Sequence, residues 1–345
     1  MGWLSRPVRT FGPLGGYQVA KHICKHQPRI LMYHRFSNPP VTGWASPDYF
    51  DRQVKYIKDR YNPYSLVELL QYQREFGKMP PHAVVITVDD GYRDFYDYAF
   101  PILRKYNVPA TLFATTGFID GRLWLWPDKI TWILERLNYI PNDFLINSLK
   151  VKSGPVDDNG RRELWKQWVA HALLVSDEEK HVFIRGLADR LGLVFPDSIP
   201  GAFAPLSWNQ LHEMQAFGIE IGGHTVTHPS LGRVSPAQAR SEIFGCRDVL
   251  KEHLGERERT FCYPNGQPSD FNDLLPELVR EAGFLGAVTA FPDAVGTRDR
   301  YLMRRHVSGD DMFQFHKAVS GVEWLGHVLR REYLLKPSYI ADEAE

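Results

Sequence analysis

The 345-residue sequence has few cysteines, no long apolar run and no excess of charge of either sign. Its three cysteines, Cys24, Cys246 and Cys262, are too few and too scattered for a disulfide framework or a Cys-x-x-Cys metal site, which favours a reducing compartment. Lys plus Arg and Asp plus Glu each number 41, so the formal net charge is zero. We therefore do not expect nucleic acid as a partner, because binding it requires a concentrated basic face.

No segment approaches the roughly 18 consecutive apolar residues of a membrane-spanning helix, and the N-terminus lacks the apolar core of a secretory signal. We expect a protein that is cytoplasmic or bound peripherally at the inner face of the membrane. Residues 1–28 are interpreted as an N-terminal extension. A poorly ordered or core-covering segment is the simpler interpretation, but contact with a membrane surface is the alternative. The aromatic and basic residues suited to such contact are Trp3, Arg6, Arg9, Phe11, Tyr17, Lys21 and Lys25.

The sequence does contain alternating strand and helix patterns, and its 43% of hydrophobic residues can bury a sizeable core. Short β-branched runs such as residues 83–88 alternate with amphipathic segments that begin at Ser46, Ser65 and Ser235. This alternation predicts an α/β fold with parallel strands. The expected division is an α/β barrel domain over 29–119 and 206–325, a mainly helical, tryptophan-rich insertion over 120–205, and a C-terminal tail over 326–345.

Two adjacent carboxylates, Asp89 and Asp90, follow the predicted buried strand at 83–88 and precede Gly91. Active sites of α/β proteins lie at the carboxyl ends of strands, where the loops converge. An Asp-Gly pair also favours an ordinary turn, so this motif alone does not separate a turn from a site.

Two histidines, His224 and His228, follow a second predicted strand. Their spacing of four residues allows both imidazoles to face one point in a helical turn or tight loop. Two histidines and one carboxylate are a usual ligand set for a divalent transition metal. Combined with Asp89 and Asp90, the pattern predicts one carboxylate that binds metal and a neighbour that takes a proton from water activated by the metal.

Three motifs carry a resemblance to a known family: TVDDGY at 87–92, GGHTVTH at 222–228 and FCYPNG at 261–266. In this order they resemble the polysaccharide deacetylase family, with the NodB-type catalytic domain of carbohydrate esterase family 4. The resemblance implies a distorted (β/α) barrel of about seven strands. It also implies metal-dependent removal of N-acetyl groups from amino sugars of a polysaccharide or of its lipid-linked precursor.

The same resemblance assigns roles to individual residues. Asp89 resembles the general base, and Asp90, His224 and His228 resemble the metal ligands, with Zn²⁺ as the usual ion. Leu31 to His34 reads L-x-x-H, a motif that most members carry near the C-terminus and that enzymes of the exopolysaccharide subgroup carry near the N-terminus. His34 is thereby expected to be the general acid that protonates the departing amine, and a purely structural histidine is the alternative.

One position departs from the family pattern, because Cys262 stands where many members have the arginine that orients the base. Arg304, in the segment LMRRHV, resembles the L-P-R segment of the exopolysaccharide subgroup and is expected to supply the missing charge. Arg305 beside it is a rival, and two ordinary surface arginines are a third interpretation.

Four further residues are expected at the substrate. The backbone N–H of Asn265 resembles a family donor to the oxyanion, a role that tolerates different side chains. Tyr263 is expected to line the sugar pocket, although a core position suits a tyrosine at a strand end equally well. Trp124 and Trp126 could stack on sugar rings, but tryptophans of this kind more often belong to a core.

Rival functions remain open from sequence alone. A homologue that binds carbohydrate without catalysis would explain the missing arginine, and a metal-dependent hydrolase of a non-sugar amide would use the same site. Iron-dependent oxygenases also use two histidines and one carboxylate. The second, unligated aspartate disfavours an oxygenase, which does not need it.

Overall fold

The computed structural model describes residues 12–335 except 42, 143–144, 147–148 and 151–152. Among these residues no helix is both long and apolar enough to cross a membrane. Of the residues considered for membrane contact, Trp3, Arg6, Arg9 and Phe11 lie outside the described part, as do residues 336–345 of the expected tail.

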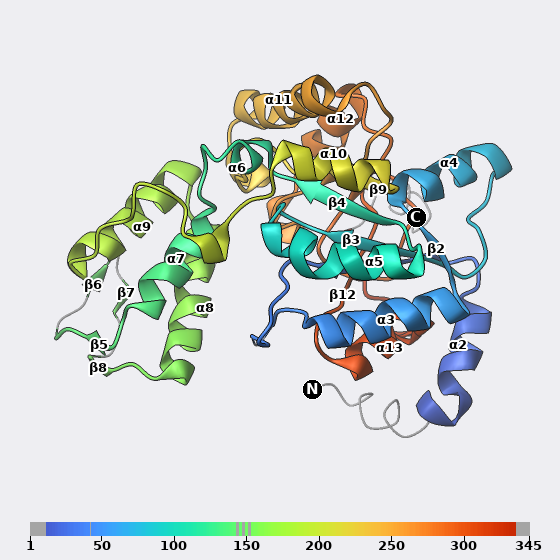
Figure 1. Cartoon of the computed structure of the whole chain (residues 1–345), viewed down its shortest axis with the longest axis horizontal. Helices are drawn as coiled ribbons and strands as arrows, with labels where there is room; N and C mark the ends of the chain where they lie inside the picture. The colour runs from blue at the N-terminus through green and yellow to red at the C-terminus, as the bar shows by residue number, and fades with distance from the viewer. Residues whose placement is uncertain (1–11, 42, 143–144, 147–148, 151–152, 336–345) are drawn as a thin grey trace.

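A parallel sheet forms the centre of the larger part of the molecule (Figure 1). Its strand order is β11-β10-β9-β4-β3-β1-β12, and β2 pairs with β3 beside this path. The strands are β1 Arg29–Tyr33, β2 Asn62–Tyr64, β3 Ala83–Val88, β4 Ala110–Ala114, β9 Ile219–Gly223, β10 Phe261–Cys262, β11 Ala287–Val288 and β12 His306–Val307. Val288 also forms a parallel bridge to Met303, just before β12, so the two ends of the sheet meet. The predicted distorted (β/α) barrel is confirmed.

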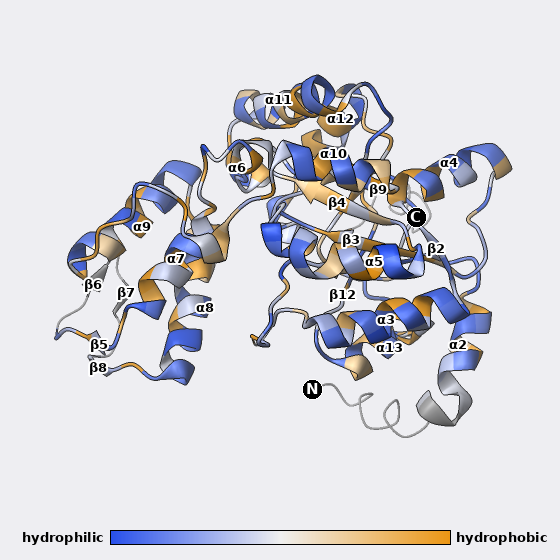
Figure 2. Ribbon diagram, in the orientation of Figure 1, coloured by the Kyte–Doolittle hydropathy of each residue, from blue (hydrophilic) through white to orange (hydrophobic). Residues whose placement is uncertain are grey.

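Helices cover the outside of the sheet (Figure 1). They are α3 Pro47–Arg60, α4 Leu66–Phe76, α5 Phe100–Tyr106, α10 Trp208–Ala216, α11 Pro236–Leu254, α12 Leu274–Glu281 and α13 Met312–Ser320, and a π-helical turn at Phe95–Ala99 precedes α5. Local sequence explains their ends: Ser65 and Glu68 form a capping box at the start of α4, and Gly77 ends it in the left-handed conformation. In Figure 2 the hydrophobic colour follows β3 and β4, whereas the surrounding helices show hydrophilic outer faces.

Strand register places the candidate residues at one edge of the sheet. Tyr33 of β1 pairs with Val88 of β3, and Ala114 of β4 pairs with Gly223 of β9. The carboxyl ends of these parallel strands therefore lie level, and the residues that follow them emerge together. All six residues of β3 are buried, as expected of a strand covered on both faces.

The insertion has a core of its own, separate from the clusters beneath the sheet. It contains α7 Trp126–Glu135, α8 Asp158–Leu174 and α9 Asp177–Arg190, with two short antiparallel pairs, β5 Tyr139–Ile140 with β8 Gly154–Pro155 and β6 Leu145–Ile146 with β7 Leu149–Lys150. Trp168 is fully buried at its centre. Its mainly helical character agrees with the expectation, while the boundaries at 120 and 205 stay a prediction.

Several short elements complete the chain, and one of them bears on the expected tail. The helix α6 Thr116–Ile119 follows β4, which ends at Ala114. The expected tail begins inside the helix α14 Val322–Arg330. The other short elements are a π-helical turn at Gly12–Gly16, the helix α2 Tyr17–Ile23, and 3₁₀ turns at Gly201–Phe203, Leu231–Arg233 and Pro268–Asp270.

Candidate metal centre and active site

The two aspartates after β3 point to different partners. Asp89 continues the strand, since its N–H donates to the Tyr33 carbonyl at 3.1 Å. Asp90 then adopts a left-handed conformation, with φ of 77°, and Gly91 follows at 99°. This sharp change of direction sends the two neighbouring carboxylates to separate places, and both are buried.

Asp90, His224 and His228 form a compact set of candidate metal ligands. Oδ1 of Asp90 lies 3.3 Å from Nε2 of His224 and 3.3 Å from Nε2 of His228. One ligand atom from each of the three residues lies within 4.8 Å of the other two. Burial raises the pKa of Asp90, but the two imidazoles outweigh burial and hold that pKa well below its ordinary value. Asp90 is therefore an anion at neutral pH, as a metal ligand must be.

The loop that carries both histidines is held by a buried carboxylate from α11. Glu242 accepts hydrogen bonds from the backbone N–H groups of Val226 and Thr227, each at 2.8 Å, and from the Thr227 hydroxyl at 2.6 Å. Within the loop, the His228 N–H donates to the Thr225 hydroxyl at 3.0 Å. Thr225 and His228 both adopt left-handed conformations, with φ of 66° and 59°. Because such a backbone is strained in these residue types, the surrounding hydrogen bonds must maintain it.

The residues fit a divalent transition metal. The carbonyl of Cys262 accepts a hydrogen bond from Nδ1 of His224 at 2.8 Å, which leaves Nε2, 3.3 Å from Oδ1 of Asp90, as the atom that can ligate a metal in place of its proton. Nδ1 of His228 is buried without a hydrogen-bond partner among the described residues. Bound to a metal, two imidazoles and one carboxylate would leave positions open for water and substrate, which is typical of catalytic zinc sites.

Asp89 is bound on both oxygens by one buried arginine, Arg305, which directly precedes β12, two strands along the sheet from β3. Nη1 of Arg305 donates to Oδ1 of Asp89 at 2.7 Å, and Nη2 donates to Oδ2 at 2.7 Å. Burial alone would raise the pKa of Asp89, but the Arg305 guanidinium brings it below its ordinary value. Asp89 is consequently ionised and fixed in orientation, and each of its oxygens retains a lone pair to accept a proton.

The expected role of Arg304 needs correction. Nε of Arg304 donates to Oδ1 of Asp293 at 2.9 Å, on a different side of the chain from Asp89. Arg305, the rival, makes the contact to Asp89, and neither residue is a surface arginine, since both are almost fully buried. Successive side chains of an extended segment point to opposite faces, so only one of the two can face the barrel interior.

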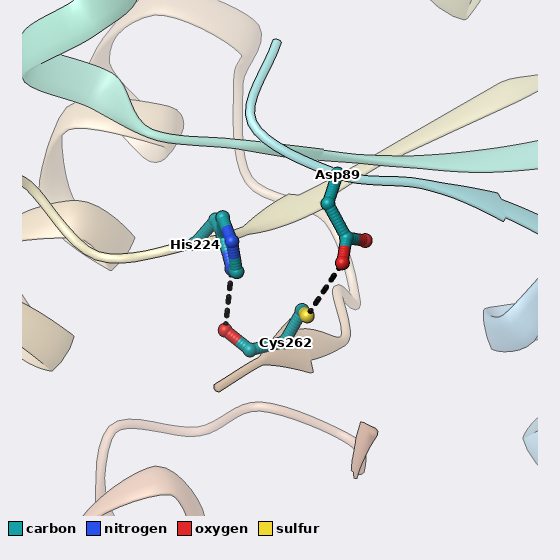
Figure 3. A group of neighbouring side chains, drawn as sticks. All are labelled: Asp89, His224 and Cys262. Atoms are coloured by element: carbon teal, nitrogen blue, oxygen red, sulfur yellow. Dashed lines mark hydrogen bonds between the residues drawn. The ribbon is translucent and has the colours of Figure 1, made fainter. Parts of the chain in front are cut away.

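Cys262 lies beside this pair rather than replacing the charge of an arginine. Its Sγ is 3.5 Å from Oδ2 of Asp89 and 3.1 Å from Nη2 of Arg305. Burial raises the pKa of the Cys262 thiol, so it is neutral. Figure 3 shows the sulfur directed at Asp89 while the Cys262 carbonyl accepts from His224.

Asp89, His224 and Cys262 also lie close enough together to be considered as metal ligands. Two observations argue against that alternative. The guanidinium of Arg305 already contacts both Asp89 and Cys262, and a second cation there would be repelled. In addition, Nε2 of His224 is directed at Asp90.

His34 follows β1 and reaches Asp89 from the solvent side. Its Nε2 lies 3.5 Å from Oδ2 of Asp89, and its side chain is 48% exposed. It is thus the accessible member of the group, and it follows β1 just as Asp89 follows the adjacent strand β3.

Of the four residues expected at the substrate, three lie in hydrophobic cores and one lies in a loop. Trp124 and Trp126 are buried in the core of the insertion, so the expectation that they stack on sugars is wrong. Tyr263 is a core residue rather than a pocket wall, because its ring packs against Phe261 and its hydroxyl donates to the Tyr301 carbonyl at 3.0 Å. Asn265 occupies the loop after β10 with φ of 60°, and its role at the oxyanion stays a prediction.

Sequence reasoning did not single out Glu242 at all. A signal was present, because Glu242 lies beside Ile243 on the buried side of α11, together with Ala239 and Cys246. A carboxylate in such a position needs hydrogen-bond donors. The left-handed backbone of Thr225 and His228, in contrast, leaves no mark in the residue types.

A model of the family described as polysaccharide deacetylase matches residues 76–143 and 159–287, more than half of the chain. The chain belongs to the polysaccharide deacetylase family. Two curated relatives show different extents of similarity. The putative polysaccharide deacetylase YxkH of Bacillus subtilis is 34% identical over 278 residues, which cover 80% of this chain and 69% of YxkH. Poly-beta-1,6-N-acetyl-D-glucosamine N-deacetylase of Staphylococcus aureus is 35% identical over 90 residues, 26% of this chain and only 31% of that protein.

Solved structures share the fold of this family member. IcaB from Ammonifex degensii aligns with a TM-score of 0.56 and 20% identity, covering 86% of this chain and 97% of that one. The deacetylase PplD of Streptococcus pyogenes, solved in complex with acetate, aligns with a TM-score of 0.55 and 21% identity, covering 85% and 96%. At these identities the likeness concerns the fold.

Proposed function

We propose that this protein is a metal-dependent hydrolase that removes N-acetyl groups from amino sugars of a polysaccharide. The observation that carries the proposal is that the two adjacent aspartates have different partners. Asp90 lies with two histidines in a metal-ligand arrangement, while Asp89 is excluded from that set and held as an anion by Arg305. The relatives named above, one of which acts on a polymer of N-acetyl-D-glucosamine, support this reaction and this substrate class.

Asp90, His224 and His228 would hold the metal, for which Zn²⁺ is the ion best suited to these ligands. A bound divalent cation supplies Lewis acidity, which lowers the pKa of water and stabilises negative charge on the amide oxygen. Asp89 would accept the proton of the attacking water, and its ionised state and the two hydrogen bonds from Arg305 support this role.

His34 completes the proton transfers from the exposed side. Its Nε2 lies close enough to Asp89 for the two residues to act on opposite ends of one scissile amide. His34 donates a proton to the departing amine, and the backbone N–H of Asn265 is assigned to the oxyanion. Arg305 occupies the place that a motif arginine would otherwise fill, so the cysteine at 262 no longer argues for an inactive, sugar-binding homologue.

The acetamido group is common to a finished polysaccharide and to a lipid-linked precursor, and the same site can act on either. An acetate-release assay separates these substrates and tests the reaction. The full-length protein would be incubated with N-acetylated oligosaccharides and with a lipid-linked N-acetylated glycan, after chelation and again after Zn²⁺ is added. We expect acetate release that chelation abolishes and zinc restores. Release that is insensitive to complete metal removal, or no release from any glycan, would contradict the proposal.

A further inference from the structure

A loop after β1 brings Trp44 back beside Arg35, the residue that follows His34. The N–H of Ala45 donates to the Arg35 carbonyl at 2.9 Å, and the N–H of Ser37 donates to the Ala45 carbonyl at 3.1 Å. These bonds close the loop into a short ladder next to the candidate acid. The Trp44 ring consequently lies over the guanidinium of Arg35, with 3.9 Å between the ring centroid and Cζ.

Arg35 is itself fixed from several sides, so it forms a rigid support for the indole. Nε of Arg35 donates to Oδ2 of Asp94 at 2.6 Å, and Nη2 donates to the Ala202 carbonyl in the insertion at 2.7 Å. The ring of Tyr92 lies over the same guanidinium, 3.8 Å from Cζ. Arg35 is therefore stacked between Trp44 and Tyr92, which holds Trp44 in place at little further cost in side-chain entropy.

Both ends of this stack adjoin the catalytic residues along the chain. Trp44 and Arg35 belong to the loop that leaves β1 through His34, and Tyr92 comes two residues after Asp90. The stack thus lies on the same edge of the sheet as the proposed reaction centre. A glycan whose acetylated sugar is held at Asp89 and Asp90 extends from that point across neighbouring residues of this edge.

Trp44 differs from the other described tryptophans in its setting. It is partly exposed and lies in a loop at the active edge of the sheet. Trp124, Trp126, Trp132 and Trp168 are buried in the insertion. Trp165 is exposed but lies on α8, where its indole N–H donates to Thr131. Trp208 is stacked on His253, and Trp324 belongs to α14.

We propose that Trp44 forms a subsite that binds a pyranose ring of the glycan next to the sugar that loses its acetyl group. The inference rests on the proposed function and adds a substrate requirement to it, namely an oligosaccharide rather than a single sugar. Sugar rings carry C–H groups on one face and pack against aromatic rings, whose hydrophobic surface and polar edge suit such a ligand. The Arg35 stack keeps the indole preorganised for this contact.

The test compares Trp44→Ala and Trp44→Phe with Trp165→Ala as the matched control, because Trp165 is an exposed tryptophan away from the sheet. Each variant is assayed for acetate release from a long N-acetylglucosamine oligosaccharide and from a single-sugar N-acetylglucosamine derivative. Trp44→Ala is expected to raise KM for the oligosaccharide about three- to tenfold, with kcat and the single-sugar kinetics unchanged. Trp44→Phe should recover most of the loss, and Trp165→Ala should match the wild type.

A binding measurement separates this inference from the proposed function. Calorimetric titration with a deacetylated glucosamine oligosaccharide requires no turnover, and Trp44→Ala should bind it more weakly by the same factor. Wild-type protein that releases no acetate would defeat the proposed function, and the subsite is then judged by binding alone. Unchanged oligosaccharide KM and binding in a folded Trp44→Ala variant, or an equal loss on both substrates, would overturn the subsite.

Discussion

Replacing Arg305 with alanine tests how the base is held, since this arginine contacts Asp89 on both oxygens. The side chain is fully buried and donates five hydrogen bonds, to Asp89 twice, Thr87, Thr289 and Cys262. Its removal leaves a buried carboxylate without a counter-charge, which costs about 3–5 kcal/mol of stability when one partner of such a pair is deleted.

The same change should alter the titration of Asp89. Arg305 opposes the effect of burial on the pKa of Asp89 more strongly than His34 and His224 do, so in its absence burial should raise that pKa. The acid limb of the kcat/KM profile for acetate release should therefore move to higher pH. Above that limb the rate should still be roughly a hundredfold lower, because the base is no longer fixed in orientation.

Two further variants make this prediction specific. Arg304→Ala is the matched control, because Arg304 is an equally buried arginine that pairs with Asp293 instead. It should lose comparable stability in urea unfolding but keep the acid limb of the wild type. The double variant Cys262→Arg, Arg305→Ala places a guanidinium on the other neighbour of Asp89 and should restore part of the rate. An unshifted acid limb and nearly wild-type kcat/KM in Arg305→Ala would refute the reasoning.

Two other predictions concern the loop of the metal ligands and the contact with the insertion. Glu242→Ala should weaken Zn²⁺ binding about tenfold or more in chelator competition, because the backbone N–H groups of Val226 and Thr227 lose their acceptor and the loop loses its shape. Unchanged Zn²⁺ affinity would mean that the loop keeps its shape without Glu242. The second prediction concerns Asp128 of α7, which accepts a hydrogen bond from the Tyr92 hydroxyl at 2.8 Å. Burial raises the pKa of Asp128 to about 7, so the folded state keeps a proton that the unfolded state loses near pH 4, and the protein should become less stable as pH rises. Between about pH 5 and pH 8 the free energy of unfolding of the wild type should fall by about 2 kcal/mol more than that of Asp128→Asn. The amide oxygen of the asparagine still accepts from Tyr92. If urea unfolding gives the two proteins parallel curves of unfolding free energy against pH, the prediction is contradicted.

The fold and the centre of the site were accessible from sequence because their signals are local. The run at 83–88 reads as a buried strand from its β-branched composition, and Ser65 with Glu68 marks the start of a helix. The carboxyl end of each strand then indicates where Asp89 and His224 emerge. Parallel strands bring such ends together, so their proximity could be expected without coordinates.

The remaining features depend on contacts between distant segments. Arg304 and Arg305 directly precede a strand of only two residues, which is too short to show an alternating pattern that would tell which of them faces Asp89. Trp124 and Trp44 are the same residue type, and only packing shows that one lies in a core and the other in a loop beside Arg35. The hydrogen bonds that Glu242 accepts from the histidine loop likewise join two segments, and neither segment's sequence shows which residues of the two will meet.

The central claim is that Asp89 and Asp90 have separate tasks, and metal content measured together with acetate release tests it most directly. Asp89→Asn should retain about one equivalent of zinc yet lose most turnover, since it removes the base but not a ligand. His228→Ala should lose both metal and turnover. Full activity in Asp89→Asn, or loss of metal in that variant with its fold intact, would contradict the account.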